Sequence, residues 1–131
     1  MTTSEQTKGQ KHIILQLGAR KMNLSPDQFR QCAFIIDELV STYDCHQFMT
    51  PVPSSAVVYH SKIKHPMDLK TLEENLFKNK YKNVKDFAKD LFLIWENAMR
   101  FHLSVDPIFQ QASTLKKRYD EIILFIQGGK R

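Results

Sequence analysis

Few glycines, few cysteines and the lack of any long apolar run exclude several classes of protein. Only 4 of the 131 residues are glycine, and no glycine-rich loop of the kind that cradles phosphate is present. The two cysteines, Cys32 and Cys45, are too few for a disulfide framework. No apolar run approaches the roughly 18 residues that a membrane span needs. We therefore predict a soluble protein of a reducing, intracellular compartment.

Motifs that carry catalytic or metal chemistry are also missing. The sequence contains no nucleophile elbow and no pair of carboxylates with catalytic spacing. Cys45, His46, His60 and His65 lack both the C-x-x-C and the helical H-x-x-x-H spacing of metal sites. We predict that the chain is not an enzyme and that it needs no metal or other cofactor.

The charge balance is basic but mild. Lysine and arginine outnumber aspartate and glutamate 19 to 14, which gives a net charge of +5. Such an excess attracts anions without establishing nucleic-acid binding. The basic residues concentrate in a run on the last helix and around an earlier loop: Lys116, Lys117 and Arg118, and Lys78, Lys80, Lys82 and Lys85. These are ordinarily solvated surfaces, and contact with DNA phosphates is the alternative, as an accessory role.

One domain accounts for most of the chain. With 42% hydrophobic residues, 131 residues are enough for a single core. We predict an N-terminal extension over residues 1–24, the domain over 25–127 and a short tail over 128–131. Residues 1–10 are polar and are expected to be flexible. The apolar residues from Ile13 to Leu17 predict a short helix or strand that lies on the domain; the alternative, a signal peptide, lacks a cleavage site.

Four amphipathic helices are predicted from their start signals and apolar periodicity. The starts are a capping box at Ser25 with Pro26 and Gln28, and N-caps at Asp68, Asn83 and Asp106. The predicted buried stripe of the first helix is Phe29, Cys32, Ala33, Ile36, Leu39, Val40 and Tyr43. That of the third helix is Val84, Ala88, Leu91, Trp95, Ala98 and His102. The pattern predicts an all-α antiparallel four-helix bundle.

The first connection is long, and it leads to the prediction of a pocket. Residues 44–65 show no helical period and are predicted to form a loop, whose apolar side chains should fold back onto the helices. In an antiparallel bundle the first and third connections lie at the same pole. Residues 48–63 are therefore expected to meet Phe101, His102 and Ile108 and to enclose a cavity there.

Three stretches of the sequence share a known pattern: Phe48-x-x-Pro51-Val52, Tyr59-x-x-x-Ile63-x-x-Pro66-Met67-Asp68-Leu69, and Asn97-Ala98-Met99-Arg100-Phe101-His102. Together they resemble the bromodomain family over about residues 25–127. The resemblance implies a left-handed four-helix bundle that reads acetyl-lysine in the nucleus without catalysis. It also implies a monomer whose partners are acetylated histone tails or other acetylated proteins and subunits of chromatin complexes.

The resemblance also implies roles for individual residues. Phe48 and Val52 match pocket-wall residues of the family, and Val57 follows them in the same loop. Tyr59 matches the tyrosine that holds the acetyl carbonyl through an ordered water, and Ile108 matches the residue that flanks the pocket entrance. Phe101 and His102 complete the expected acetyl-lysine pocket.

Several positions depart from the family pattern. His46-Gln47-Phe48 stands where bromodomains have Trp-Pro-Phe, and the loop after Val52 is shorter. Phe101 replaces a tyrosine, and His102 replaces the asparagine that anchors the acetyl group. A primary amide offers a donor and an acceptor from one flat group, whereas a neutral imidazole offers one donor and an acceptor that points elsewhere.

Different interpretations of His102 stay open. In one, the ring fills the pocket, and the domain is a protein-protein or DNA-contacting scaffold without acetyl-lysine binding. In the other, the ring donates to an acyl carbonyl, and recognition is weakened or altered. Binding is then expected to change between roughly pH 5.5 and 8, where histidine side chains change charge. A function unrelated to acyl groups is a further alternative.

Overall fold

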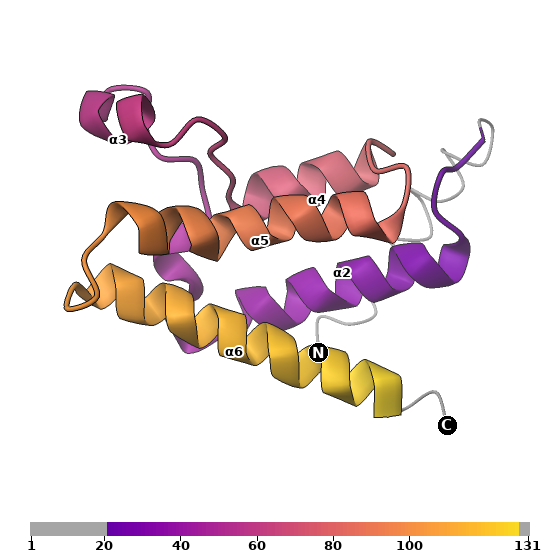
Figure 1. The fold of residues 1–131 in the computed structure, drawn as a ribbon. Coiled ribbons are helices and arrows are strands. Elements are labelled where there is room, and N and C mark those ends of the chain that lie inside the picture. Colours follow the sequence, from indigo (N-terminus) through magenta and orange to yellow (C-terminus); the bar gives the residue numbers. More distant parts are fainter. Residues whose placement is uncertain (1–20, 129–131) are drawn as a thin grey trace.

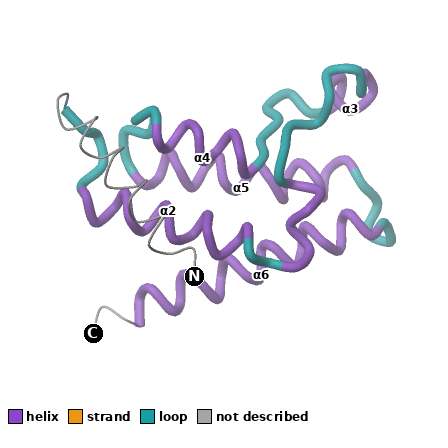
Figure 2. Tube along the Cα trace, turned by 180° about the vertical axis from the view of Figure 1, so that it is seen from behind, coloured by secondary structure: helices purple, strands orange, loops and turns teal. Residues whose placement is uncertain are grey.

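Helices dominate the computed structural model, which describes residues 21–128 (Figure 1). In chain order the elements are α2 (Pro26–Val40), the 3-10 helix η1 (Tyr43–Phe48), α3 (Val57–Lys62), α4 (Leu69–Phe77), α5 (Val84–Phe101) and α6 (Pro107–Gly128). The predictions for residues 1–20 and 129–131 lie outside the described part. Helices α2, α4, α5 and α6 pack lengthwise, which confirms the predicted all-α antiparallel bundle (Figure 2). None of the described helices combines the length and apolarity required to cross a membrane.

The helix starts agree with the sequence signals. Ser25 and Gln28 form a reciprocal capping box, in which the Ser25 Oγ accepts from the Gln28 N–H at 3.1 Å and the Gln28 Oε1 accepts from the Ser25 N–H at 2.9 Å. Three further side chains cap helices by accepting from a backbone N–H. Asp68 accepts from Thr71 (2.9 Å), Asn83 from Asp86 (2.8 Å) and Asp106 from Ile108 (2.8 Å). Each cap satisfies a backbone donor that lacks a partner within its helix.

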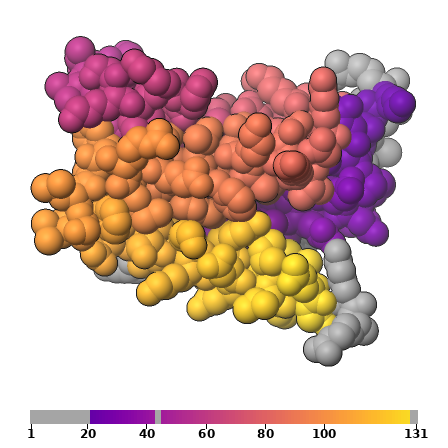
Figure 3. All heavy atoms as spheres, viewed as in Figure 1, coloured from indigo at the N-terminus to yellow at the C-terminus, as the bar shows by residue number. Residues whose placement is uncertain are grey.

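The connection between α2 and α4 is more regular than predicted. It contains η1 and α3, each of 6 residues, which are too short for a helical period to stand out in the sequence. Val57 and Val58 are 72% and 63% exposed, so the prediction that they fold back onto the bundle was wrong. They lie on α3, which projects from the bundle at the pole where α5 ends and α6 begins (Figure 3).

The core lies between the four long helices. Leu39, Leu72, Leu91 and Leu115, one from each helix, are all 0% exposed. Burial raises the pKa of the Cys32 thiol to about 12, so this side chain stays protonated and acts as a small apolar group in the core.

The buried side of α5 is wider than the predicted stripe. Phe87, Ile94 and Asn97 are buried although the stripe omits them, and Val84 is 37% exposed. Both α4 and α6 pack on α5, so a single apolar stripe describes this helix poorly. Val40 was also predicted to be buried, but it is 38% exposed because it is the last residue of α2, where the chain turns toward η1.

The N-terminal side of the bundle includes residues before α2. Leu24 is 4% exposed and belongs to the core. Asn23 donates two hydrogen bonds of 3.1 Å to Asn79, from its backbone N–H to the Oδ1 and from its Nδ2 to the carbonyl oxygen, and these attach the segment to the turn between α4 and α5. The division of the chain into residues 1–24, 25–127 and 128–131 stays a prediction.

Candidate functional site

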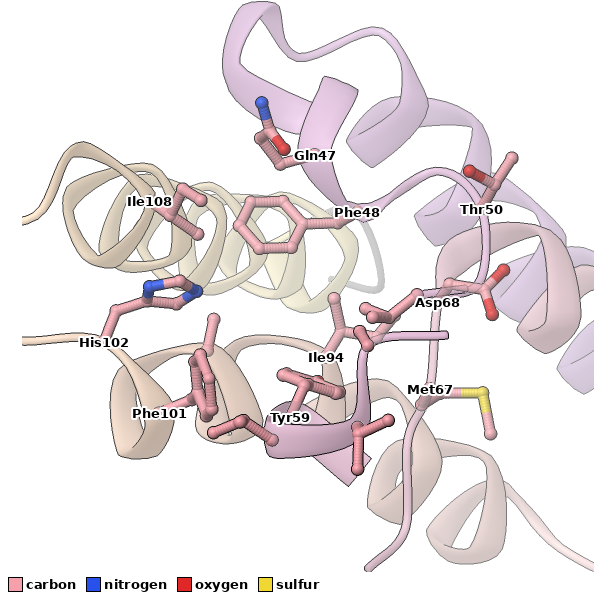
Figure 4. A pocket seen from close by; sticks show the side chains of 15 residues that line it. Gln47, Phe48, Thr50, Tyr59, Met67, Asp68, Ile94, Phe101, His102 and Ile108 are labelled. Atoms are coloured by element: carbon pink, nitrogen blue, oxygen red, sulfur yellow. The ribbon is translucent and has the colours of Figure 1, made fainter. Parts of the chain in front are cut away.

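A cavity of about 430 Å³ opens where the α2–α4 connection meets the end of α5 and the start of α6 (Figure 4). Fifteen residues line it: Gln47, Phe48, Thr50, Val52, Ala56, Val57, Val58, Tyr59, Met67, Asp68, Ile94, Ala98, Phe101, His102 and Ile108. The two connections therefore meet at one pole of the bundle, as the sequence predicts.

The structure brings together all the residues that were predicted for the pocket. Phe48, Val52, Val57, Tyr59, Phe101, His102 and Ile108 all line the cavity. Ile94 and Ala98 also line the cavity, although they were not predicted to do so. They precede His102 by eight and four residues on the same helix, so the helical period is the signal that finds them. Gln47, Thr50, Ala56 and Val58 carried no such signal, because the short helices and loops between α2 and α4 show no helical period in the sequence.

Aromatic rings form one wall of the cavity. The rings of Tyr59 and Phe101 meet edge to face at 4.9 Å, and the rings of Phe101 and His102 meet at 5.0 Å. Lys62 places its Nζ 5.8 Å from the Phe101 ring centre. Burial raises the pKa of the Tyr59 phenol, so this group stays protonated at neutral pH and is able to donate a hydrogen bond.

Two polar side chains, His60 and Asn97, hold the connection in place around the cavity. The Nε2 of His60 lies 3.3 Å from the carbonyl oxygen of Val52 and 3.0 Å from that of Pro53. Both partners are acceptors, so Nε2 carries the proton and donates. The Nδ2 of Asn97, a residue only 3% exposed, donates to the carbonyl oxygen of His65 at 2.8 Å. The His60 contacts connect α3 to Val52 in the cavity wall and to Pro53. The Asn97 bond connects α5 to the segment before α4.

His102 lies at the end of α5, and its ring points into the cavity (Figure 4). Its backbone N–H donates to the carbonyl oxygen of Ala98 at 2.9 Å, which completes the last turn of the helix. The side chain is 21% exposed, and its Nδ1 lies 3.5 Å from the Oδ2 of Asp106. The imidazole is therefore partly buried at the cavity and close to a carboxylate.

The lining suits a ligand with an apolar stem and a polar tip. Most lining side chains are apolar or aromatic, and the polar groups are few. The Asp68 carboxylate is already engaged, since its two oxygens accept from the Thr71 N–H at 2.9 Å and the Thr71 Oγ1 at 2.6 Å. Tyr59 and His102 are the ionisable side chains left to contact such a tip. In the part of the chain that the structure describes, no group of three His, Cys, Asp or Glu side chains is placed to hold a metal ion.

A family model described as Bromodomain matches residues 32–114, which is more than half of the chain. The chain belongs to the bromodomain family. The matched range includes the whole α2–α4 connection, all of α5 and the first turns of α6. Every cavity-lining residue of this bromodomain thus falls within the family match.

Relatives and solved structures agree with this assignment. "Transcription factor GTE11" of Arabidopsis thaliana is 32% identical over 96 residues, 71% of this chain and 16% of that protein. The "SWR1 complex bromodomain subunit bdf1" of Schizosaccharomyces pombe is 25% identical over 114 residues, 82% of this chain and 20% of that protein. The bromodomain therefore spans about a fifth or less of the length of these two relatives.

A solved bromodomain structure matches most of this chain. The structure of the second bromodomain of Bdf1 from Candida albicans, in the unbound form, superposes with a TM-score of 0.69 at 28% sequence identity. The match covers 76% of this chain and 97% of the other. Nearly the complete architecture of that solved bromodomain is therefore present here.

Proposed function

We propose that this bromodomain binds acyl-lysine side chains, with acetyl-lysine as the reference ligand, and that His102 weakens or alters this recognition. The observation that carries the proposal is the open cavity of about 430 Å³ with the His102 ring at its wall. An apolar lysine stem fits the aromatic and aliphatic walls, and the acyl group reaches the polar atoms of His102 and Tyr59.

The expected affinity is modest because an imidazole replaces a carboxamide. A carboxamide donates to the acyl carbonyl and accepts from the acyl N–H, whereas one ring nitrogen performs only one of these roles. Losing one hydrogen bond costs about 1–1.5 kcal/mol, which corresponds to roughly a five- to tenfold loss of affinity.

The alternative function is a scaffold domain that contacts proteins or DNA without binding acyl groups. The contact between the rings of His102 and Phe101 at 5.0 Å is the observation in its favour, because it holds the imidazole against the wall. The cavity nevertheless keeps its volume with the ring in this position, which favours acyl-lysine binding.

The partners that we propose are chromatin proteins. Two relatives are named as a transcription factor and as a subunit of the SWR1 complex. Acetylated histone tails, or other acetylated proteins of such complexes, present the side chain that the cavity fits. We accordingly propose that the protein acts in the nucleus, as a monomer.

The test is a titration of the protein with histone-tail peptides, acetylated and unmodified, followed by NMR. We expect weak binding of the acetylated peptide to the wild type, with shifts at Phe48, Tyr59 and His102. His102→Asn restores a carboxamide, and the acetylated peptide should then bind about tenfold more tightly. Neither protein is expected to bind the unmodified peptide at this site.

The matched control is His65→Asn, the same substitution at an exposed histidine that does not line the cavity. It should leave the titration unchanged. If only His102→Asn binds the acetylated peptide, the scaffold function is favoured. If neither protein binds it, acyl-lysine recognition is excluded for this chain.

A second candidate, accessory contact with DNA, rests on four lysines around the α4–α5 turn: Lys78, Lys80, Lys82 and Lys85. Among the side chains that the structure describes, no carboxylate lies within ion-pair distance of these ammonium groups. By contrast, Arg118 on α6 contacts Glu38 at 2.7 Å and Glu121 at 3.3 Å, and Lys116 contacts Asp120 at 3.9 Å. The run on α6 is therefore partly neutralised, and we place the DNA contact at the turn.

We expect the wild type to bind duplex DNA with an affinity that falls steeply as salt rises. The double substitution Lys80→Gln with Lys82→Gln should lower the slope of log K against log salt by about 1 for each phosphate that is no longer neutralised. Lys116→Gln with Lys117→Gln is the control and should change the slope less. Absence of duplex binding at low salt would exclude the DNA contact.

A further inference from the structure

Asp106 links the turn after α5 to the cavity. It lies four residues after His102, directly before α6. Its Oδ1 accepts a hydrogen bond from the Ile108 N–H at 2.8 Å, and its Oδ2 lies 3.5 Å from the Nδ1 of His102. The same carboxylate thus caps α6 and faces one nitrogen of the imidazole. The cap bond restrains the carboxylate, so this arrangement does not depend on a freely rotating side chain.

The position of the carboxylate decides which imidazole nitrogen carries the proton. A neutral imidazole has one N–H donor and one bare nitrogen that accepts. With a bare Nδ1, a lone pair would face the negative charge of Asp106, whereas an N–H at Nδ1 is attracted to it. The carboxylate therefore favours the neutral form with the proton on Nδ1. Nε2, the ring nitrogen farther from the backbone, is then an acceptor.

This form is unsuited to an acyl carbonyl. The carbonyl oxygen and an unprotonated Nε2 are both acceptors, so no hydrogen bond forms between them. Adding a proton gives an imidazolium, which donates from both nitrogens and has Asp106 as its counter-ion. We propose that Asp106 is a positioning residue that keeps the neutral His102 proton on Nδ1, so that His102 donates to an acyl carbonyl only when it takes up a second proton. This inference rests on the proposed acyl-lysine function.

Among the side chains that the structure describes, Asp106 is the charged group that faces His102. Tyr59 on α3 stays neutral, because burial raises its pKa. Lys62, also on α3, lies over the Phe101 ring. Asp68, before α4, directs both oxygens to Thr71. The residues of η1 that line the cavity, Gln47 and Phe48, and Ile108 of α6 are uncharged.

Uptake of a second proton by His102 gives the pH dependence of binding a definite sign. Since binding of the carbonyl takes up a proton, affinity rises as pH falls through the range in which histidine changes charge. For the wild type we expect about tenfold tighter binding of the acetylated peptide at pH 5.5 than at pH 8. A carboxamide at position 102 does not titrate, so the affinity of His102→Asn should be the same at both pH values.

The decisive variant is Asp106→Asn. Asparagine is an equally good N-cap, so its side-chain oxygen retains the bond from Ile108, while its NH₂ group donates toward Nδ1 of His102. The neutral proton should then move to Nε2. The acetylated peptide should bind the variant about tenfold more tightly than the wild type at pH 8, and with little dependence on pH. Asp120→Asn removes an exposed carboxylate from α6 and is the matched control; it should behave as the wild type.

The first measurement needs no peptide. Imidazole ¹⁵N shifts of the free protein at pH 8 report the tautomer, and we expect Nδ1–H in the wild type and Nε2–H in Asp106→Asn. An Nε2–H tautomer in the wild type, or the same tautomer in both proteins, would overturn the role of Asp106.

The second measurement is the peptide titration at both pH values. Wild-type binding that is equal at pH 5.5 and pH 8 would overturn the proton-linked mechanism and leave acyl-lysine binding intact. If the expected tautomers are found but the acetylated peptide binds at neither pH, the proposed function fails, while the positioning of the His102 proton by Asp106 stands.

Discussion

Replacing Phe87 by alanine will lower the free energy of unfolding by about 3–5 kcal/mol, because the substitution leaves a cavity in a packed interior. The Phe87 side chain is 1% exposed and meets the Tyr81 ring edge to face at 5.7 Å. It lies on the side of α5 that the sequence pattern did not mark as buried. A large loss of unfolding free energy would show that residues buried outside the predicted stripe of α5 contribute to stability.

The measurement is urea unfolding followed by the fluorescence of Trp95, the single tryptophan, and by circular dichroism. Phe125→Ala is the matched control, since Phe125 is 70% exposed and stacks on Phe34 at the surface of the bundle. That variant should lose less than about 1 kcal/mol. Equal losses for the two variants would contradict the burial of Phe87.

Replacing Asn97 by aspartate will cost about 3 kcal/mol or more, because it turns the donor to the His65 carbonyl into a buried acceptor with a negative charge. Asn97 is 3% exposed, so water is not available to solvate the new charge. The hydrogen bond that this variant lacks connects α5 to the segment that leads into Met67 and Asp68 at the cavity wall.

Urea unfolding gives the loss of stability, and hydrogen exchange gives its location. We expect the backbone N–H groups of residues 69–72 to lose protection, since the segment before them is no longer held. Glu96→Gln, a change of one charge at the exposed neighbouring position, should leave both measurements unchanged. Unchanged exchange in Asn97→Asp would show that other contacts hold the segment in place.

Strong local patterns in the sequence predicted the helix starts correctly. Ser25, Asp68, Asn83 and Asp106 were identified as caps because capping depends on a few consecutive residues. The pocket residues were found through the family resemblance and through the rule that alternate connections of an antiparallel bundle share a pole. Their function in acyl-lysine binding stays a prediction.

The sequence missed features that depend on neighbours distant in the chain. Exposed Val57 and Val58 have the composition of core residues, and only the projection of α3 from the bundle leaves them in solvent. Arg118 was predicted to face water, but it contacts Glu38 across the packing of α2 on α6. Local periodicity does not contain such information, because it describes one helix at a time.

By itself, the sequence determined the four helices, their caps and the pole at which two connections meet, because these follow from periodicity and from chain direction. Tertiary structure alone decided which nitrogen of His102 faces a carboxylate and which further side chains, such as Gln47 and Thr50, share the cavity. Both features depend on the conformation of the turn after α5 and on the position of α3 beside it. Packing between separate elements sets these positions to within a few ångströms, and the sequence of one element does not contain that information.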